Sequence, residues 1–225
     1  MHISSKIFSF LFFNYLDNQL FHFISSFKLQ FINDSVNKKL SRNWTCFFHA
    51  FISVLLSLNV ILDQNSSNYL LLENFSSGYF LYDSVYIMIY DKKSLSSYLY
   101  LYHHLVSIYI IVKGKEYFIE QILFWAELSN IPSYFVYHFL KMNDNRSIIW
   151  KKIQQIMYIV IRIPILGYLS INIFNNVEDK LPVYFCLPVY LMGIIYLTII
   201  NLIFTLKGLV IHLKIIIMNC LAILI

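Results

Sequence analysis

Several ionisable side chains lie inside apolar stretches that are long enough to span a lipid bilayer. They are Asp83, the adjacent pair His103 and His104, Glu127 and Arg162. A charged side chain near the centre of a bilayer costs roughly 2.5 to 3.5 kcal/mol on insertion scales. Residues of this kind in such surroundings pair with one another or act on a substrate, so they are the first candidates for a functional site.

The histidine pair is the part of this set best suited to catalysis. Histidine titrates near neutral pH and can act as a general base or a nucleophile toward a hydroxyl or an amine. Neighbours on a helix point about 100° apart, so His103 and His104 cannot both aim at one point in the same way. One can face a ligand while the other orients it or bonds a neighbouring helix, and Ser107 extends the same polar stripe. The alternative is that the pair only fixes helix packing.

The embedded carboxylates need a cation, because burial disfavours their charged form. Arg162, beside Pro164, is the candidate, since arginine stays charged and can clamp a carboxylate with two hydrogen bonds. A purely structural salt bridge between Arg162 and Glu127 is therefore the alternative to a functional role for these two residues. His49 either joins this polar set or lies at the membrane surface, and His138 is expected at the interface near a helix end.

The composition predicts an integral membrane protein. Of the 225 residues, 59% are hydrophobic and 13% are charged, which is far from the balance of a water-soluble domain. Each crossing takes about 20 residues, so the length suits an all-α bundle of six or seven transmembrane helices. The apolar runs are continuous rather than alternating, which argues against an outer-membrane barrel.

Charge and cysteine content narrow the classes of function. The net charge of +5 does not indicate a nucleic-acid partner, because the lysines lie in short loops between apolar segments. Cys46, Cys186 and Cys220 are far apart in apolar segments and predict neither a disulfide framework nor a zinc site. We expect no metal and no cofactor.

The apolar runs also predict the organisation of the chain. Residues 1–37 form an N-terminal segment in which 7–31 is either a first transmembrane helix or an interfacial helix. Residues 63–77 are expected to form a polar loop, and 209–225 are an apolar tail that crosses, lies on or leaves the membrane. The clear spans are expected at residues 44–62, 78–90, 98–112, 117–140, 153–174 and 182–206.

The lysines and arginines support this layout, because cytoplasmic loops carry an excess of them. Three lie on the side predicted to be outside, Lys113, Lys115 and Lys180. Sequons at Asn65 and Asn74 fall in a loop predicted to be lumenal, although others fall on the inner side, so sequons alone do not decide the orientation. Ten lie on the side predicted to be inside: Lys38, Lys39, Arg42, Lys92, Lys93, Lys141, Arg146, Lys151, Lys152 and Lys207.

Taken together, these positions resemble the TLC domain, the ceramide-synthase-like lipid family. The resemblance covers residues 38–208 and is closest to the small TLC-domain-containing transmembrane proteins. Its motifs are Arg42, His49-Ala50, the run from Ser77 to Asp83, His103-His104, the run from Ala126 to Pro132, and Arg162.

The resemblance implies two functions. The first is a protein that binds, senses or handles membrane lipids, with sphingolipids and acyl chains as candidate partners. The second is an N-acyltransferase that moves an acyl chain from acyl-CoA to a sphingoid base, with His103 and His104 as the catalytic pair. Ceramide synthases carry further aspartates downstream of their histidines, where this chain offers Glu127 and Asp144. Whether a reaction is catalysed is left open.

The remaining expectations also come from the resemblance. One branch of the family acts through protein contacts, so a chaperone or translocation partner is a third class. The expected location is the endoplasmic reticulum or another intracellular membrane, and the oligomeric state is left open. We expect the bundle to enclose a polar lipid pocket formed by His49, Asp83, Glu127 and Arg162.

Overall fold

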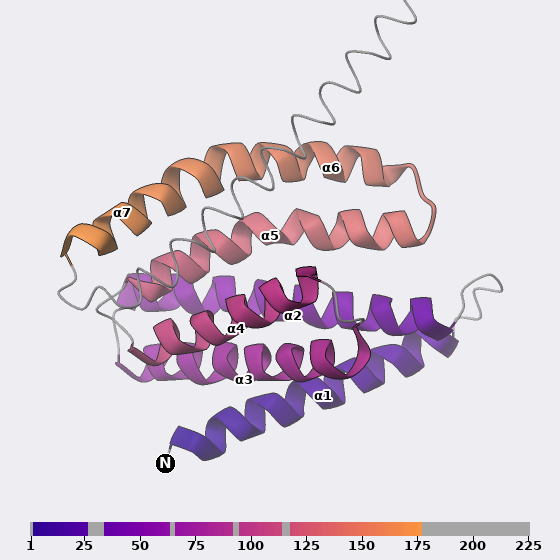
Figure 1. Ribbon diagram of the computed structural model, residues 1–225, viewed down its shortest axis with the longest axis horizontal. Helices are drawn as coiled ribbons and strands as arrows, with labels where there is room; N and C mark the ends of the chain where they lie inside the picture. Colours follow the sequence, from indigo (N-terminus) through magenta and orange to yellow (C-terminus); the bar gives the residue numbers. More distant parts are fainter. Residues whose placement is uncertain (1, 27–33, 64–65, 92–94, 114–117, 177–225) are drawn as a thin grey trace, which may run out of the picture. The chain divides into compact units, whose positions relative to one another are not determined.

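The computed structural model describes most of the chain as helices. The described residues are 2–26, 34–63, 66–91, 95–113 and 118–176. The span expected at 182–206 and the apolar tail at 209–225 lie outside these residues. Within the described part the regular structure is entirely helical, which confirms the all-α fold class (Figure 1). The helices are α1 (His2–Ser26), α2 (Asp34–Asp63), α3 (Ser66–Tyr90), α4 (Leu95–Lys113), α5 (Ile119–Lys141), α6 (Arg146–Met157), the π-helical turn η2 (Tyr158–Leu166) and α7 (Gly167–Asn176).

Helices α2 and α5 pack side by side in opposite directions. The contacts of α2 show this, because its N-terminal Asn43 bonds Tyr134 near the end of α5, whereas His49 faces Glu127, two turns earlier. Helix α2 packs against α1, α3 and α5 and so lies at the centre of the helices (Figure 1).

Helix α2 buries polar side chains and exposes apolar ones. Ser41, Thr45, His49, Ser53 and Ser57 recur at every fourth position and are fully buried. Residues four apart lie on one face of a helix, so these side chains form a continuous polar stripe toward the interior. The opposite face exposes large apolar side chains, among them Phe51, Leu55, Leu58 and Leu62. This is the reverse of the pattern in a water-soluble bundle.

Within the described residues, α2 is the one helix that is both long and apolar enough to cross a membrane. The apolar stretch Ser97–Val112 in α4 is shorter. A single helix of this kind is weak evidence for membrane association.

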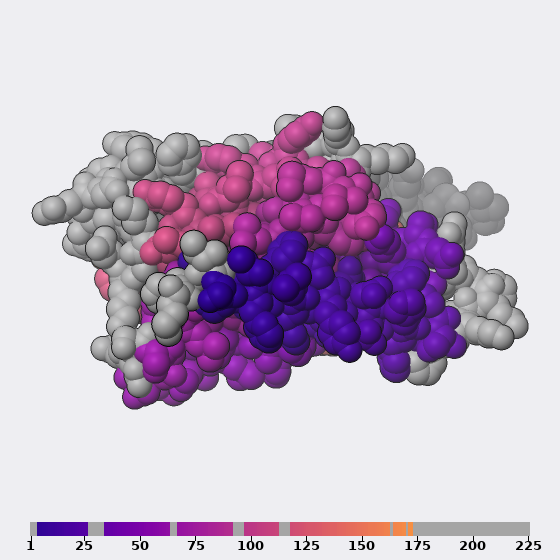
Figure 2. All heavy atoms as spheres, turned by 90° about the horizontal axis from the view of Figure 1, so that it is seen from below, coloured from indigo at the N-terminus to yellow at the C-terminus, as the bar shows by residue number. Residues whose placement is uncertain are grey.

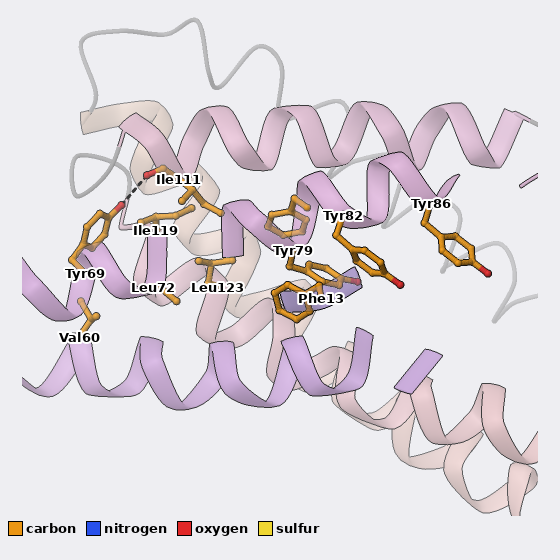
Figure 3. Packing of buried hydrophobic residues seen from close by; sticks show 11 residues of the cluster. Phe13, Val60, Tyr69, Leu72, Tyr79, Tyr82, Tyr86, Ile111, Ile119 and Leu123 are labelled. Atoms are coloured by element: carbon orange, nitrogen blue, oxygen red, sulfur yellow. Dashed lines mark hydrogen bonds between the residues drawn. The ribbon is translucent and has the colours of Figure 1, made fainter. Parts of the chain in front are cut away.

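Helix α1 packs against α2 and α3. Figure 2 shows the face of the molecule on which α1 lies (indigo). Phe13, midway along α1, is fully buried and contacts the rings of Tyr79 and Tyr82 (Figure 3). Aromatic pairs at these distances add stabilisation beyond the area that they bury. Gly78 of α3 allows the close approach, because a Cβ there would lie 2.9 Å from the backbone nitrogen of Phe10.

The start of α3 differs from the sequence-based prediction. The polar loop expected at 63–77 is wrong, because α3 begins at Ser66 and continues without a break to Tyr90. Polar residues within 66–77 are buried by neighbouring helices, for example Ser76, Ser77 and Asn74. Their burial explains why hydropathy alone fails here. It also places Asn74 of the second sequon where a glycosylating enzyme cannot reach it in the folded protein.

The helix expected at 153–174 begins earlier, at Arg146, and changes its hydrogen-bonding pattern midway. Pro164 has no backbone N–H and cannot make the bond that an α-helix needs, and its ring crowds the preceding turn. The stretch Tyr158–Leu166 takes up the mismatch as a wider π-helical turn. This turn packs against α5 and carries Arg162 toward it.

Candidate functional site

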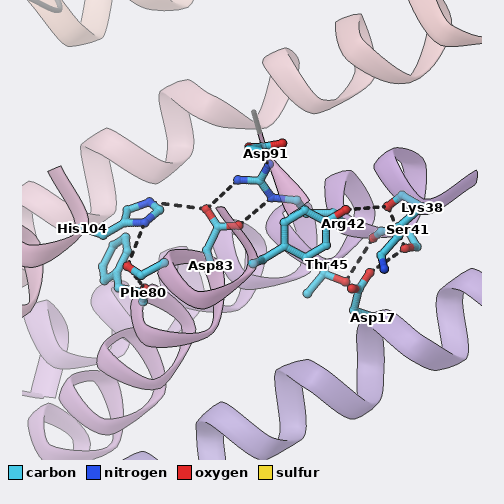
Figure 4. Close-up of polar contacts among 11 residues, drawn as sticks. Asp17, Lys38, Ser41, Arg42, Thr45, Phe80, Asp83, Asp91 and His104 are labelled. Carbon is cyan, nitrogen blue, oxygen red and sulfur yellow. Dashed lines mark hydrogen bonds and ion pairs between the residues drawn. The ribbon is translucent and has the colours of Figure 1, made fainter. Parts of the chain in front are cut away.

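The core of the polar site is a carboxylate clamped by an arginine. Asp83 of α3 is 4% exposed and accepts two hydrogen bonds from Arg42 of α2, from Nε at 2.7 Å and from Nη2 at 3.0 Å (Figure 4). The Nη1 atom of Arg42 bonds Asp91 at 3.1 Å. A planar guanidinium matches a carboxylate in this two-bond geometry, so the pair fixes the direction of both side chains.

Arg42, rather than Arg162, is therefore the cation of Asp83. The sequence placed Arg42 in a basic cluster at the membrane surface, because it precedes the apolar run of α2. The ring of Tyr86 lies 4.7 Å from its guanidinium and supports its side chain. The signal that could have found it is spacing, since seven residues, about two helical turns, separate Arg42 from His49 and put both on one face of α2.

The two adjacent histidines occupy different environments, as their angular separation predicts. His104 is buried, and its Nε2 lies 3.5 Å from Asp83 Oδ2 while its Nδ1 lies 3.4 Å from the hydroxyl of Ser84 (Figure 4). His103 is exposed, with its ring centre 5.7 Å from that of His104. The hydroxyl of Ser107 donates to the backbone carbonyl of His103, one turn earlier in α4, and so bonds the helix backbone.

His49 is completely buried in the centre of the helices. Its ring stacks on that of Tyr79, with centroids 3.7 Å apart and planes inclined by 8°. Its Nε2 lies 3.0 Å from the hydroxyl of Ser53, which in turn lies 3.2 Å from that of Ser76. Its Nδ1 points toward Glu127 Oε1 at 4.0 Å, beyond hydrogen-bonding distance. His49 therefore belongs to the interior polar set and not to the membrane surface.

Glu127 is connected to Arg162 through a side-chain amide. Asn130 donates to Glu127 Oε2 at 3.4 Å and accepts from Arg162 Nη2 at 2.8 Å. Asn130 therefore links Arg162 to Glu127, the two residues for which the sequence suggested a salt bridge. The ring of Tyr158 lies 4.6 Å from the Arg162 guanidinium and supports it from the other side.

His138 lies in the last turn of α5, as expected for a residue near a helix end. Its ring centre is 5.2 Å from that of Trp44, so it contributes to aromatic packing between α2 and α5.

Two polar groups result, and α2 joins them. In the first, Arg42, Asp83 and His104 connect α2, α3 and α4; in the second, His49 and Glu127 connect α2 and α5. Buried carboxylates next to a histidine can orient its ring and stabilise its charged form, as in general-base catalysis. Among the residues that the structure describes, no group of three or more His, Cys, Asp or Glu side chains is placed to hold a metal ion.

Comparison of the chain with models of known protein families finds no match, and comparison with characterised proteins finds no similar sequence.

Proposed function

We propose that this chain is a multi-pass membrane protein of TLC type that binds, senses or handles membrane lipids at its internal polar site. The observation that carries the proposal is the reversed pattern of α2, which turns a stripe of hydroxyl and imidazole groups inward and Leu, Phe and other apolar side chains outward. Exposing these apolar side chains to water is unfavourable, whereas contact with lipid tails is not.

The other helices support the same reading. Large apolar side chains are exposed along α1, α3, α4 and α6, for example Phe8, Met88, Leu105 and Ile156, each more than half exposed. Exposed apolar surface of this extent marks a region that contacts a membrane or a partner. Buried Asp83 is paired with Arg42, and buried Glu127 is linked to Arg162 through Asn130, in line with the tendency of ionisable groups at membrane depth to find partners.

The membrane part of the proposal is tested by placing one charge at two depths. Leu55→Asp, on the exposed face near the middle of α2, should reduce membrane insertion by about 2.5 to 3.5 kcal/mol. The matched control is Leu62→Asp, on the same outward face but beside Asp63 at the helix end, where a charge reaches water. Insertion is measured as the fraction retained in membranes after alkaline extraction. Equal, unimpaired folding of both variants without membranes would refute the proposal.

The lipid part is tested at the histidine pair. Cells that express the native chain are compared by lipidomics with cells that express His103→Ala/His104→Ala at equal abundance. A sphingolipid change that requires the native pair supports lipid handling. Identical profiles would restrict the pair to helix packing and favour a role through protein contacts in the endoplasmic reticulum or another intracellular membrane.

A second candidate function is N-acyl transfer from acyl-CoA to a sphingoid amine. The observation that favours it is the exposed His103 beside His104, whose ring is held by Asp83. In this reaction His103 would take the proton of the attacking amine. The new N–C bond forms at the thioester carbonyl, the C–S bond breaks, and His103 passes the proton to the departing sulfur, so that coenzyme A leaves as its thiol. Membranes given labelled acyl-CoA and sphingoid base would form a new amide only with the native pair.

A further inference from the structure

Three exposed lysines lie toward the end of the helices at which α5 is followed by α6 (Figure 1). Lys39 is in the second turn of α2, Lys141 is the last residue of α5, and Lys152 is midway along α6. The bond from Asn43 to the carbonyl of Tyr134 fixes the register of α2 against α5. Because these two helices run in opposite directions, Lys39 lies one turn beyond this bond and Lys141 two turns beyond it, toward the same end.

The charges of these three lysines are not neutralised within the part of the chain that the structure describes. Two acids at this end already have partners, because Asp91 binds Arg42 and Asp144 binds Arg146. No ion pair joins any of the three lysines to a described acid. Their ammonium groups are therefore available to an anionic partner outside the protein.

The side chains around Lys152 indicate what kind of partner fits. Ile148 and Ile149 precede it by one turn of α6, Ile156 follows it by one turn, and each of these isoleucines is more than half exposed. Residues three and four apart share a face of a helix, so Lys152 stands within an outward apolar face. A soluble anion would leave the isoleucines in water. A phospholipid supplies acyl chains for the isoleucines and a charged head group for the ammonium.

Aromatic side chains at the same depth match the boundary between the bilayer and water. The ring of Trp150 stacks on Phe135 with centroids 4.3 Å apart, and Trp44 of α2 meets the same phenylalanine at 6.0 Å. Tryptophan is enriched at the level of the lipid head groups. Lys152 is two residues from Trp150, about 3 Å along the helix axis, so its long side chain can reach this level.

We propose that Lys39, Lys141 and Lys152 form a binding surface for phospholipids with anionic head groups, separate from the internal polar site. The anionic lipids of a cytoplasmic leaflet attract basic residues that lie close to the membrane surface. This inference rests on the membrane location in the proposed function, and it does not depend on any reaction at the histidine pair.

The test measures quenching of tryptophan fluorescence by brominated phospholipids in nanodiscs. Trp125→Phe leaves Trp44 and Trp150 as reporters beside the lysine surface. The purified full chain with this change is reconstituted in phosphatidylcholine that contains a fixed fraction of brominated phosphatidylserine or brominated phosphatidylcholine. We expect the serine lipid to bind beside the reporters about fivefold more strongly, which corresponds to about 1 kcal/mol for one lysine at each head group.

Replacing all three lysines by glutamine should bring this ratio close to one, and so should a high salt concentration, which screens the attraction. Two controls should keep the native ratio. Lys113→Gln removes a positive charge at the C-terminal end of α4, and Arg146→Gln/Asp144→Asn removes an ion pair that is already neutral.

The possible outcomes separate this inference from the proposed function. A native ratio near one overturns the lipid assignment and leaves an acidic protein segment as the partner of the lysines. A preference that survives in the triple glutamine variant overturns the assignment to these residues. Failure of the native chain to enter nanodiscs of either composition overturns the proposed function as well.

Discussion

Arg42 and Asp83 are joined by two hydrogen bonds, at 2.7 and 3.0 Å, although 41 positions separate them in the chain. The contact connects α2 to α3, and His104 Nε2, 3.5 Å from the same carboxylate, extends it to α4. One buried carboxylate therefore determines the relative register of three helices.

Removing this arginine should destabilise the protein more than removing an exposed one. Arg42→Ala leaves Asp83 buried without its cation, which costs about 3 to 5 kcal/mol. Adding Asp83→Asn should recover part of the loss, because the unpaired charge is then gone. Unfolding of the purified protein in mixed detergent micelles measures both. Arg146→Ala is the control, since the side chain of Arg146 is 67% exposed; equal losses at the two arginines would contradict the prediction.

Gly78 should be essential for the packing of α1 on α3. In Gly78→Ala the new Cβ meets the Cβ of Ser9 and lies 3.0 Å from the backbone oxygen of Lys6, so α1 must shift away. We expect a loss of about 1 to 3 kcal/mol, the usual cost of overpacking. The same unfolding measurement detects it.

A double mutant identifies the cause of that loss. Ser9→Gly removes the first clashing atom, so Gly78→Ala should cost less in a Ser9→Gly background than in the native chain. Equal costs in the two backgrounds would show that the helices do not approach each other at this point.

The two ends of the helices differ in charge, which predicts an orientation. Among the described residues, Lys38, Arg42, Lys141 and Arg146 lie at one end with their neighbouring lysines, and Asp63 lies at the other. The basic end should face the cytoplasm. In a chain without its native cysteines, a membrane-impermeant maleimide should label Asn145→Cys only from the cytoplasmic side and Asp63→Cys only from the opposite side. Labelling of both from one side would exclude this orientation.

Asp144 should titrate below the usual range for an aspartate. It accepts bonds from the side chain and the backbone N–H of Arg146 at the start of α6, and these bonds lower the pKa of its carboxyl group. Because the folded pKa is lower than the unfolded one, the stabilisation is present above the unfolded value and is lost as pH falls through the folded one. NMR titration of the carboxyl carbon measures this shift. Arg146→Gln should raise the pKa back toward its ordinary value, and an unchanged pKa would contradict the proposed cause.

The sequence by itself determined the helical class and identified several of the ionisable residues that lie in the interior. Long apolar runs allow few other structures, and ionisable residues inside them, such as Asp83 and Glu127, stand out because burying them is costly. The sequence did not predict the first turns of α3, because many of their residues are polar. Asn74, Ser76 and Ser77 look like loop residues by composition, and only the helices packed around them make their burial favourable.

Only the tertiary structure decided which charges pair. The sequence shows three arginines and several acids, but partners from different helices depend on which helices are neighbours and in which register. Because α2 packs against α3, Asp83 pairs with Arg42. Because α5 packs against η2, Arg162 donates a hydrogen bond to Asn130. Packing α2 against α5 brings His49 to within 4.0 Å of Glu127 although nothing local links them. Local patterns specify each helix, whereas distances between side chains follow from how the helices meet.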